Sequence, residues 1–187
     1  MDFSSLKTAS AIPGAAAMIE TFRAIGYSLE TAVADIVDNS ISASARNVWI
    51  NRIWKGGDSV ITIRDDGHGM SGEEIIQAMR PGAQNPLEER SATDLGRFGL
   101  GLKTASFSQC RTLTVMSKIQ GQSPEFWTWS LDHVARCDRW ELVHWCPEGF
   151  EHELDDLASG TIVIWTDPDR IIPAATKAEN ENAKRKF

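Results

Sequence analysis

The stretch VITIRDDGHGM at residues 60–70 joins an apolar strand pattern to an acidic, glycine-containing turn. Val60–Arg64 is dominated by β-branched residues, which favour strands. The glycines of the segment Asp65–Gly69 let the backbone turn sharply and approach a bound group without a Cβ in the way. Asp65 can accept a hydrogen bond from an exocyclic amine such as that of adenine. Ordinary Asp-Gly turns after strands are also frequent, so this stretch alone leaves both interpretations open.

Before this stretch, the sequence predicts two helices, at Gly14–Ile25 and Ser28–Ser44. In the second helix, Asp35 and Asn39 are four residues apart and therefore lie on one stripe. Asn39 offers a hard oxygen ligand for Mg²⁺, and Asp35 is placed to orient or deprotonate an attacking water. Taken by itself, the stripe is also compatible with the solvated face of an amphipathic helix.

A third segment reads GRFGLGLK at residues 96–103 and is rich in glycine. It leads into a helix predicted from about Gly99 to Phe107, and the N-terminal dipole of a helix favours anions such as phosphate. Lys103 adds a positive charge there. The spacing matches neither a Walker A loop nor the dinucleotide fingerprint, and a flexible hinge is the alternative. The preceding loop, Pro81–Leu95, has the length of a lid.

The rest of the chain predicts strands and one more helix around these segments. A hairpin links Val48–Trp54 to the strand at residue 60, and a helix capped by Ser71 runs to about Arg80. We expect helices on one face of a mixed, mostly antiparallel sheet, an α/β two-layer sandwich. We further expect one domain over residues 1–170, followed by a polar tail over 171–187. The later strands are predicted at Thr112–Ile119, Glu125–Leu131, Trp140–Trp145 and Thr161–Thr166.

Composition narrows the classes of function. Acidic residues outnumber basic residues by 26 to 19, and the net charge of −7 argues against a chain-wide basic surface for nucleic acid. A local basic patch stays open. No apolar run is long enough to cross a bilayer, and the N-terminus has no signal-peptide pattern. The three cysteines form no CxxC pair, which favours a reducing compartment, so we expect a cytoplasmic protein with no membrane partner.

A zinc site is a minor alternative. Cys137, Cys146, His133 and His144 have ligand side chains, but their spacing fits no familiar zinc template. We therefore expect core cysteines on strands and surface histidines instead.

Together the three segments resemble the GHKL ATPase superfamily, which includes DNA gyrase B, the heat-shock 90 chaperones, histidine kinases and MutL. The residues that carry the resemblance are DIVDNS at 35–40, DDGHGM at 65–70 and GRFGLGLKTAS at 96–106. In detail they look closest to MORC-type ATPases and their bacterial relatives. The resemblance covers about residues 14–167 and implies a Bergerat fold, with ATP held between the helices and a long lid.

The resemblance also implies roles for individual residues. Asn39 would hold Mg²⁺, Asp65 would bind the adenine amine, and Thr161 would support that aspartate. The turn after Asp65 and the glycine-rich loop would complete the nucleotide site. The residues implied there are Gly67, Gly69, Met70, Gly96, Arg97, Phe98, Gly99, Leu100, Gly101, Leu102 and Lys103.

One position departs from the family pattern. Hydrolytic members usually carry Glu where this chain has Asp35, which is one methylene shorter and displaces the carboxylate, an offset that matters to catalysis. With this departure, the resemblance implies Mg²⁺-dependent ATP binding with slow hydrolysis by the domain over residues 1–170. It also implies a nucleotide-dependent homodimer, and coupling to a DNA-related function through a local patch or through a downstream domain to which residues 171–187 lead.

Three alternatives stay open beside that prediction. The first is a nucleotide-binding switch without significant hydrolysis. A histidine-kinase catalytic domain ranks lower, since no dimerising helix with a phosphoacceptor histidine precedes the site. A serine hydrolase through Ser106 or Ser108 lacks the G-x-S-x-G elbow.

Overall fold

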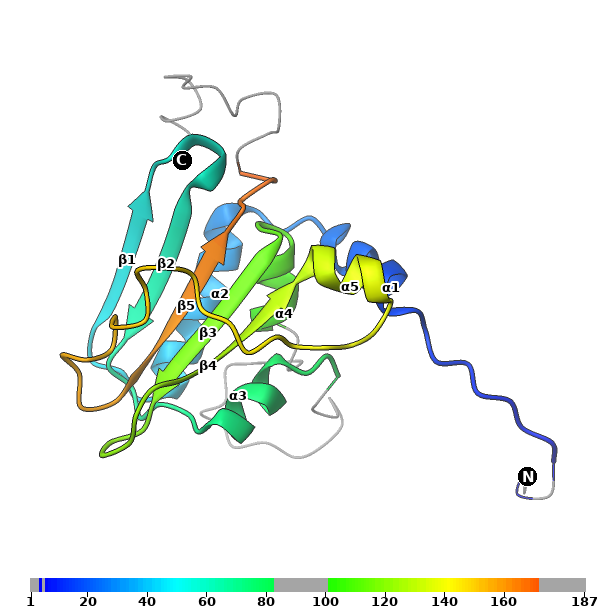
Figure 1. Ribbon diagram of the computed structural model, residues 1–187, viewed down its shortest axis with the longest axis horizontal. Helices are drawn as coiled ribbons and strands as arrows, with labels where there is room; N and C mark the ends of the chain where they lie inside the picture. The colour runs from blue at the N-terminus through cyan, green and yellow to red at the C-terminus, as the bar shows by residue number, and fades with distance from the viewer. Residues whose placement is uncertain (1–3, 5, 83–100, 172–187) are drawn as a thin grey trace.

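The computed structural model describes residues 4, 6–82 and 101–171. Its centre is a five-stranded sheet in the order β1-β2-β5-β3-β4, so the last strand lies in the middle (Figure 1). Every pairing between these strands is antiparallel. The predicted antiparallel character is thus confirmed, but the expectation of a mixed sheet was wrong for the described strands. The strands are β1 Val48–Ile53, β2 Val60–Asp65, β3 Thr112–Lys118, β4 Glu125–Ser130 and β5 Gly160–Thr166.

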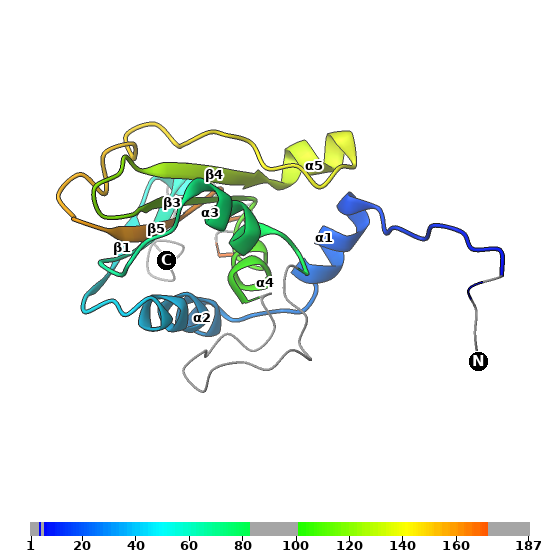
Figure 2. The same cartoon turned by 90° about the horizontal axis from the view of Figure 1, so that it is seen from below.

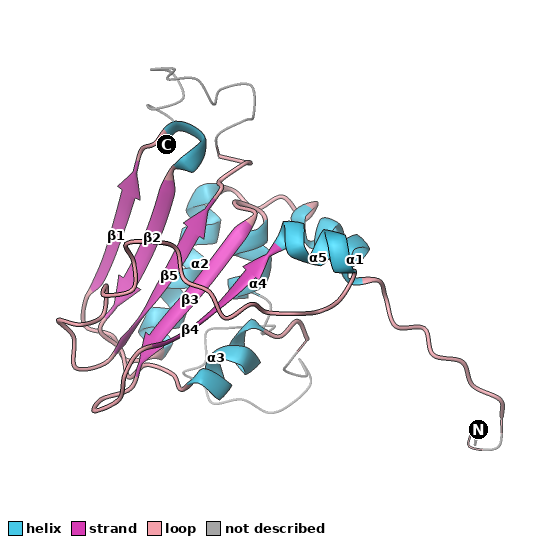
Figure 3. Ribbon diagram, in the orientation of Figure 1, coloured by secondary structure: helices cyan, strands magenta, loops and turns pink. Residues whose placement is uncertain are grey.

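Helices cover one face of this sheet (Figures 2 and 3), as the sequence predicts for a two-layer α/β sandwich. Local capping sets where two of them begin. Ser28 Oγ accepts a hydrogen bond from the Thr31 amide at the start of α2. Ser71 and Glu74 form a reciprocal capping box at the start of α3. The helices on this face are α1 Ala15–Arg23, α2 Leu29–Ser42, α3 Gly72–Met79 and α4 Gly101–Phe107.

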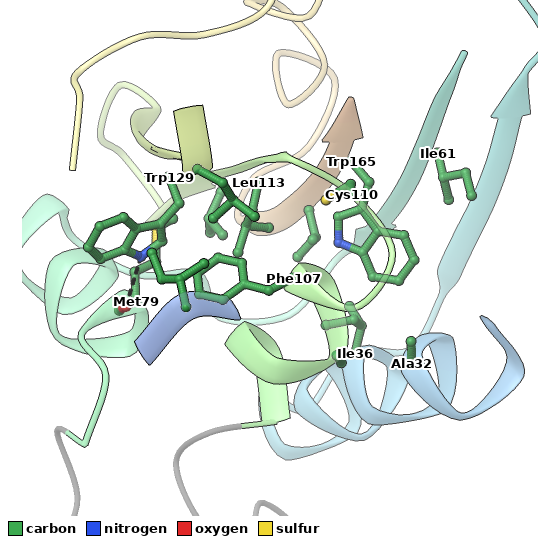
Figure 4. Packing of buried hydrophobic residues seen from close by; sticks show 14 of the residues in the cluster. Ala32, Ile36, Ile61, Met79, Phe107, Cys110, Leu113, Trp129 and Trp165 are labelled. Carbon is green, nitrogen blue, oxygen red and sulfur yellow. Dashed lines mark hydrogen bonds between the residues drawn. The ribbon is translucent and has the colours of Figure 1, made fainter. Parts of the chain in front are cut away.

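The main core lies between the helices and the sheet (Figure 4). Two buried tryptophans on the sheet hold helices in place by packing of their rings and by hydrogen bonds from their indole N–H groups. Trp129 Nε1 donates to the Met79 carbonyl at the end of α3 over 3.0 Å. Trp165 Nε1 donates to Ser106 Oγ in α4 over 2.8 Å. The indoles therefore dock α3 and α4 on the sheet while leaving no buried donor unpaired at these two positions.

The opposite face of the sheet is covered by a loop segment, residues 146–157, rather than by helices (Figure 2). Leu154 in this segment is fully buried against Met116, Ile162 and Ile164 of the strands. A short 3-10 turn, η1 Gly56–Asp58, joins β1 to β2 where the hairpin is predicted. Among the described helices, none has the combination of length and apolar character needed to cross a lipid bilayer.

The chain after β4 differs from its prediction. The expected strand at Trp140–Trp145 is absent, and only an isolated bridge joins Val143 to Thr128. A helix that the sequence did not predict, α5 Leu131–Cys137, starts directly after β4. Ser130 Oγ caps it by accepting a hydrogen bond from the His133 amide over 3.2 Å. Tertiary packing overrides the strand-like alternation here, since the Trp140 ring packs edge-on against Trp129.

The cysteines are also placed differently from the prediction. Cys110 lies in the core but between α4 and β3, Cys137 ends α5, and Cys146 lies in the loop segment. None of the three is on a strand, so the expectation of strand-borne core cysteines was wrong.

Candidate functional site

Asp65 ends β2 with its side chain buried, at 5% exposure, on the face of the sheet that the helices cover. Its two carboxylate oxygens have different partners. Oδ1 accepts a hydrogen bond from the Gly67 amide at 2.9 Å, and Oδ2 accepts one from Ser40 Oγ of α2 at 2.8 Å. A carboxylate oxygen can accept more than one hydrogen bond. Asp65 is thus fixed in place and still has acceptor capacity for a ligand amine.

The neighbouring Asp66 points elsewhere and does a different job. Its Oδ1 accepts hydrogen bonds from the backbone amides of Arg46 and Asn47, and its Oδ2 accepts one from the Asn47 side chain. These hydrogen bonds lower the pKa of Asp66, with the backbone bond from Asn47 as the largest cause. Asp66 therefore closes the turn after α2, whereas Asp65 faces the helix-covered side.

Thr161 lies directly across from Asp65 on the neighbouring strand, and Ser117 lies across from Thr161 on the next. The hydroxyl groups of Thr161 and Ser117 are 2.8 Å apart. Ser117 Oγ also accepts a hydrogen bond from the Met70 amide at 2.8 Å. Because directly paired residues share one face of a sheet, Asp65, Thr161 and Ser117 form a polar row across β2, β5 and β3. The row ties the turn that contains Met70 to the sheet.

The turn after Asp65 requires glycine at two positions. Gly69 has a φ of +74°, and a Cβ there would lie 2.0 Å from the Lys118 carbonyl oxygen. A Cβ on Gly67 would lie 2.8 Å from the Ala43 Cβ. Any side chain at either position would push the turn off β3 or off the end of α2. The sharp turn that both glycines predict is therefore present, and their close approach to a bound base stays a prediction.

Asp35 and Asn39 are one turn apart on α2, as their spacing predicts. Asp35 is half-buried and Asn39 is exposed. Within the described residues, neither side chain has a hydrogen-bond partner. Their oxygens are therefore available to water, to a cation or to a ligand, unlike those of Asp65.

The first residue of α4 lies beside Asp35. A Cβ on Gly101 would lie 3.5 Å from Asp35 Oδ2. The end of the glycine-rich segment and the acidic stripe of α2 are therefore neighbours, and Leu102, the next residue, is half-buried against the core. The structure thus brings Asp35 and Gly101 together although they are far apart in the sequence.

Lys103 does not extend freely into solvent. Its side chain is 2% exposed, and its Nζ donates a hydrogen bond to the Ala78 carbonyl of α3 at 2.8 Å. Burial lowers the pKa of Lys103 to about 8. Lys103 therefore links α4 to α3 in this conformation.

Part of the predicted phosphate site lies outside the described residues. This holds for Gly96, Arg97, Phe98, Gly99 and Leu100, and for all of the Pro81–Leu95 loop except its first two residues.

Two residues of the site are absent from the sequence-based prediction, Ser40 and Ser117. For Ser40 a signal exists in the sequence, because it follows Ile36 by four residues and therefore shares its buried stripe. A small polar residue on the buried face of a helix needs a partner there. No comparable signal marks Ser117, whose role depends on the pairing of β3 with β5.

Comparison with known sequences is consistent with this geometry. A family model described as histidine kinase-, DNA gyrase B-, and HSP90-like ATPase matches residues 27–161, a range that includes α2, the Asp65 turn and α4. The ATPase morc-1 of Caenorhabditis elegans is 33% identical over 91 residues, which are 49% of this chain and 10% of that protein.

Two DNA mismatch repair proteins MutL are also similar. The protein of Thermus aquaticus is 37% identical over 97 residues, which are 51% of this chain and 17% of that protein. The protein of Paramagnetospirillum magneticum is 29% identical over 132 residues, 70% of this chain and 21% of that protein. This chain thus spans about a fifth or less of the length of these curated relatives. Because the family model covers well over half of its residues, the chain belongs to the histidine kinase-, DNA gyrase B- and HSP90-like (GHKL) ATPase family.

Proposed function

We propose that this chain binds ATP together with Mg²⁺ and hydrolyses the nucleotide slowly. One observation carries the proposal: α2 contacts both of the other site segments. Its Ser40 holds the Asp65 carboxylate at 2.8 Å, and its Asp35 lies beside Gly101 at the start of α4. These contacts support a nucleotide site whose adenine end and phosphate end both rest on α2.

At the adenine end, Asp65 is the acceptor for the exocyclic amine. Its position is fixed before any ligand arrives, because Ser40 and Gly67 already bond to it. A fixed acceptor loses little conformational freedom on binding. Gly67, Gly69 and Met70 shape the turn beside the base, and Thr161 supports the row to which Asp65 belongs.

The donor set of α2 fits Mg²⁺. Asn39 has an exposed amide oxygen, and Mg²⁺ prefers oxygen ligands while keeping several waters and sharing others with phosphate. When bound, Mg²⁺ neutralises charge on the phosphate oxygens. Asp35, one turn away, is the general base that takes a proton from the attacking water. In this proposal the phosphate end is completed by Gly96, Arg97, Phe98, Gly99, Leu100, Gly101 and Leu102. Lys103 joins them only on release of its hydrogen bond to the Ala78 carbonyl.

Calorimetry with Mg²⁺ and ATP on the 187-residue chain tests binding. A titration without detectable heat, at protein concentrations that would reveal micromolar affinity, would overturn the proposal. Single-turnover hydrolysis then separates the slow ATPase from the binding-only switch, which is the second candidate. The observation that favours the switch is the short side chain of Asp35.

We also propose that nucleotide binding closes the Pro81–Leu95 lid and drives formation of a homodimer. In this scheme residues 1–170 are the ATP-binding domain and residues 171–187 lead to a downstream domain. A role in handling DNA is proposed by analogy with relatives named DNA mismatch repair proteins. Light scattering with a non-hydrolysable ATP analogue tests the dimer, and a mass that stays monomeric at saturation would refute it.

A further inference from the structure

The end of α5 brings together three potential metal ligands that lie outside the nucleotide site. They are His133 and Cys137 of α5 and Glu141 of the segment that follows, and one ligand atom from each lies within 4.8 Å of the others. His133 Nε2 is 3.4 Å from Glu141 Oε2, and Cys137 Sγ is 4.0 Å from the same oxygen. We propose that these three side chains form a Zn²⁺ site whose fourth position is open to water or to an external ligand.

The chemistry and spacing of the ligands favour zinc over a hard cation. An imidazole, a thiolate and a carboxylate are the three side-chain types that Zn²⁺ binds, whereas Mg²⁺ and Ca²⁺ select oxygen alone. Tetrahedral Zn²⁺ at its usual bond lengths places ligand atoms about 3.3–3.7 Å apart. The observed nitrogen–oxygen separation of 3.4 Å already falls in this range. The separations that involve the sulfur are longer, 4.0 Å to the oxygen and no more than 4.8 Å to the nitrogen. Binding therefore draws the sulfur inward by up to about an ångström, which a change of side-chain torsion supplies.

The backbone that carries the ligands is held from several sides. His133 and Cys137 are four residues apart on α5 and therefore lie on one face of it. Asp138 ends the helix in a left-handed conformation, with a φ of 48°. Its carboxylate accepts a hydrogen bond from the Ala16 amide at 2.9 Å, which ties the end of α5 to the start of α1. The Trp140 ring packs against Trp129 and so positions the segment that leads to Glu141.

A neighbouring charge also orients the carboxylate. Arg139 Nε lies 3.2 Å from Glu141 Oε1, which leaves Oε2 directed to the histidine and the cysteine. Hydrogen-bonded partners of this kind commonly hold metal-ligating carboxylates. The side chains of His133 and Glu141 are 32% and 37% exposed, so an ion can reach the site from solvent.

Cys110, Cys146 and His144 are unsuited to this role. Cys146 packs against the cluster of Leu154, Met116, Ile162 and Ile164 on the other face of the sheet, where burial raises the pKa of its thiol to about 11. The His144 ring stacks on Phe126 with the ring centres 4.5 Å apart. Burial also raises the pKa of the Cys110 thiol. Of the four residues with zinc-ligand side chains named from the sequence, the structure thus keeps His133 and Cys137, and it adds Glu141.

Cobalt titration of the reduced 187-residue chain tests the site, because a thiolate bound to Co²⁺ gives a charge-transfer band in the near ultraviolet. We expect a band in the parent protein that saturates at one equivalent and is displaced by Zn²⁺. Cys137→Ser should remove the band, and His133→Gln should weaken Zn²⁺ binding at least about 100-fold. Cys146→Ser and His144→Gln are the matched controls, and each should keep both the charge-transfer band and the parent affinity for Zn²⁺.

Far-ultraviolet circular dichroism of each variant separates loss of a ligand from loss of the fold. If Cys137→Ser does not fold, Glu141→Gln provides the same measurement with Cys137 intact, and we expect a weakened band. The proposal is overturned if the parent protein shows no band, if the band survives Cys137→Ser, or if the Cys146 and Cys137 variants lose it equally.

Discussion

The two ends of the candidate nucleotide site differ in how far the protein itself supplies hydrogen-bond partners for their side-chain oxygens. Asp65 is buried and accepts hydrogen bonds from Ser40 and Gly67. Asp35 and Asn39 are more exposed, and within the described part of the chain they have no hydrogen-bond partner. The proposed adenine end is therefore preorganised, whereas the proposed phosphate end has free oxygens that a cation and its ligand would complete. Affinity should depend mainly on the first region and turnover on the second.

The largest expected effect comes from Asp65→Asn. The asparagine side chain keeps the shape of the aspartate but places its NH₂ group, a donor, where the carboxylate had an acceptor. The hydrogen bond from the adenine amine is therefore lost. We expect the affinity for Mg²⁺ and ATP to fall at least about 100-fold by calorimetry.

Asp66→Asn is the matched control, because that carboxylate only closes the turn after α2. We expect it to keep the affinity within about threefold. Equal losses in the two variants would mean that neither aspartate contacts the base.

Asp35→Asn should separate binding from chemistry. Removing the general base should slow single-turnover hydrolysis at least about 100-fold, while the affinity stays within about threefold because the amide is isosteric. Asp38→Asn, three residues further along α2, is the control and should hydrolyse ATP at the parent rate. Unchanged hydrolysis in the Asp35 variant would remove this residue from the base role.

Ser40→Ala probes how much the preorganisation of Asp65 contributes. The buried carboxylate loses one charge-assisted hydrogen bond, so we expect an affinity about tenfold lower. Ser42→Ala lies two residues away and removes only a hydroxyl that donates to the Asp38 carbonyl at 3.0 Å. Indistinguishable affinities for these two variants would show that Asp65 does not depend on α2 for its position.

The smallest effect concerns Lys103, which the geometry places between α4 and α3 and not at the free end of the site. Its pKa is about 8 in the folded chain against 10.5 ordinarily. Below pH 8 Lys103 is protonated in both the folded and the unfolded chain, so folding bears the full cost of burying its positive charge. Between about pH 8 and 10.5 the folded chain releases the proton first, so stability rises with pH.

Comparison with Lys103→Met isolates this contribution. The free energy of unfolding of the parent, relative to the variant, should increase by about 1 kcal/mol between pH 7 and 9. Urea unfolding at several pH values measures the difference. A difference that does not change with pH would mean that Lys103 stays charged, as a residue reaching toward solvent would.

The sequence predicted the parts of the site that are local in the chain. The stripe of Asp35 and Asn39 follows from helical spacing, and the sharp turn after Asp65 follows from its glycines. Ser117 could not be found in this way, because its role depends on lying beside Thr161, 44 residues later. Pairings between distant strands are set by the whole fold and not by local pattern.

The same limit explains the errors after β4. The segment Trp140–Trp145 alternates like a strand, but one bridge to Thr128 is all that it forms. Leu131–Cys137 is short, and its helix depends on the Ser130 cap and on packing of Leu131 and Val134 into the core. Elements of this length are stabilised by their surroundings more than by their own propensity.

The place of β5 in the sheet has a consequence for how the protein is made. β1 with β2 and β3 with β4 are two local hairpins, and β5 alone joins them in the centre. A ribosome delivers β5 last of the five, so until residues 160–166 emerge each hairpin presents an unpaired inner edge, which invites wrong pairing. Thr161 arrives on that same strand. A nascent chain therefore cannot assemble the row around Asp65 before synthesis has passed β5, and nucleotide binding is expected only after the sheet is complete.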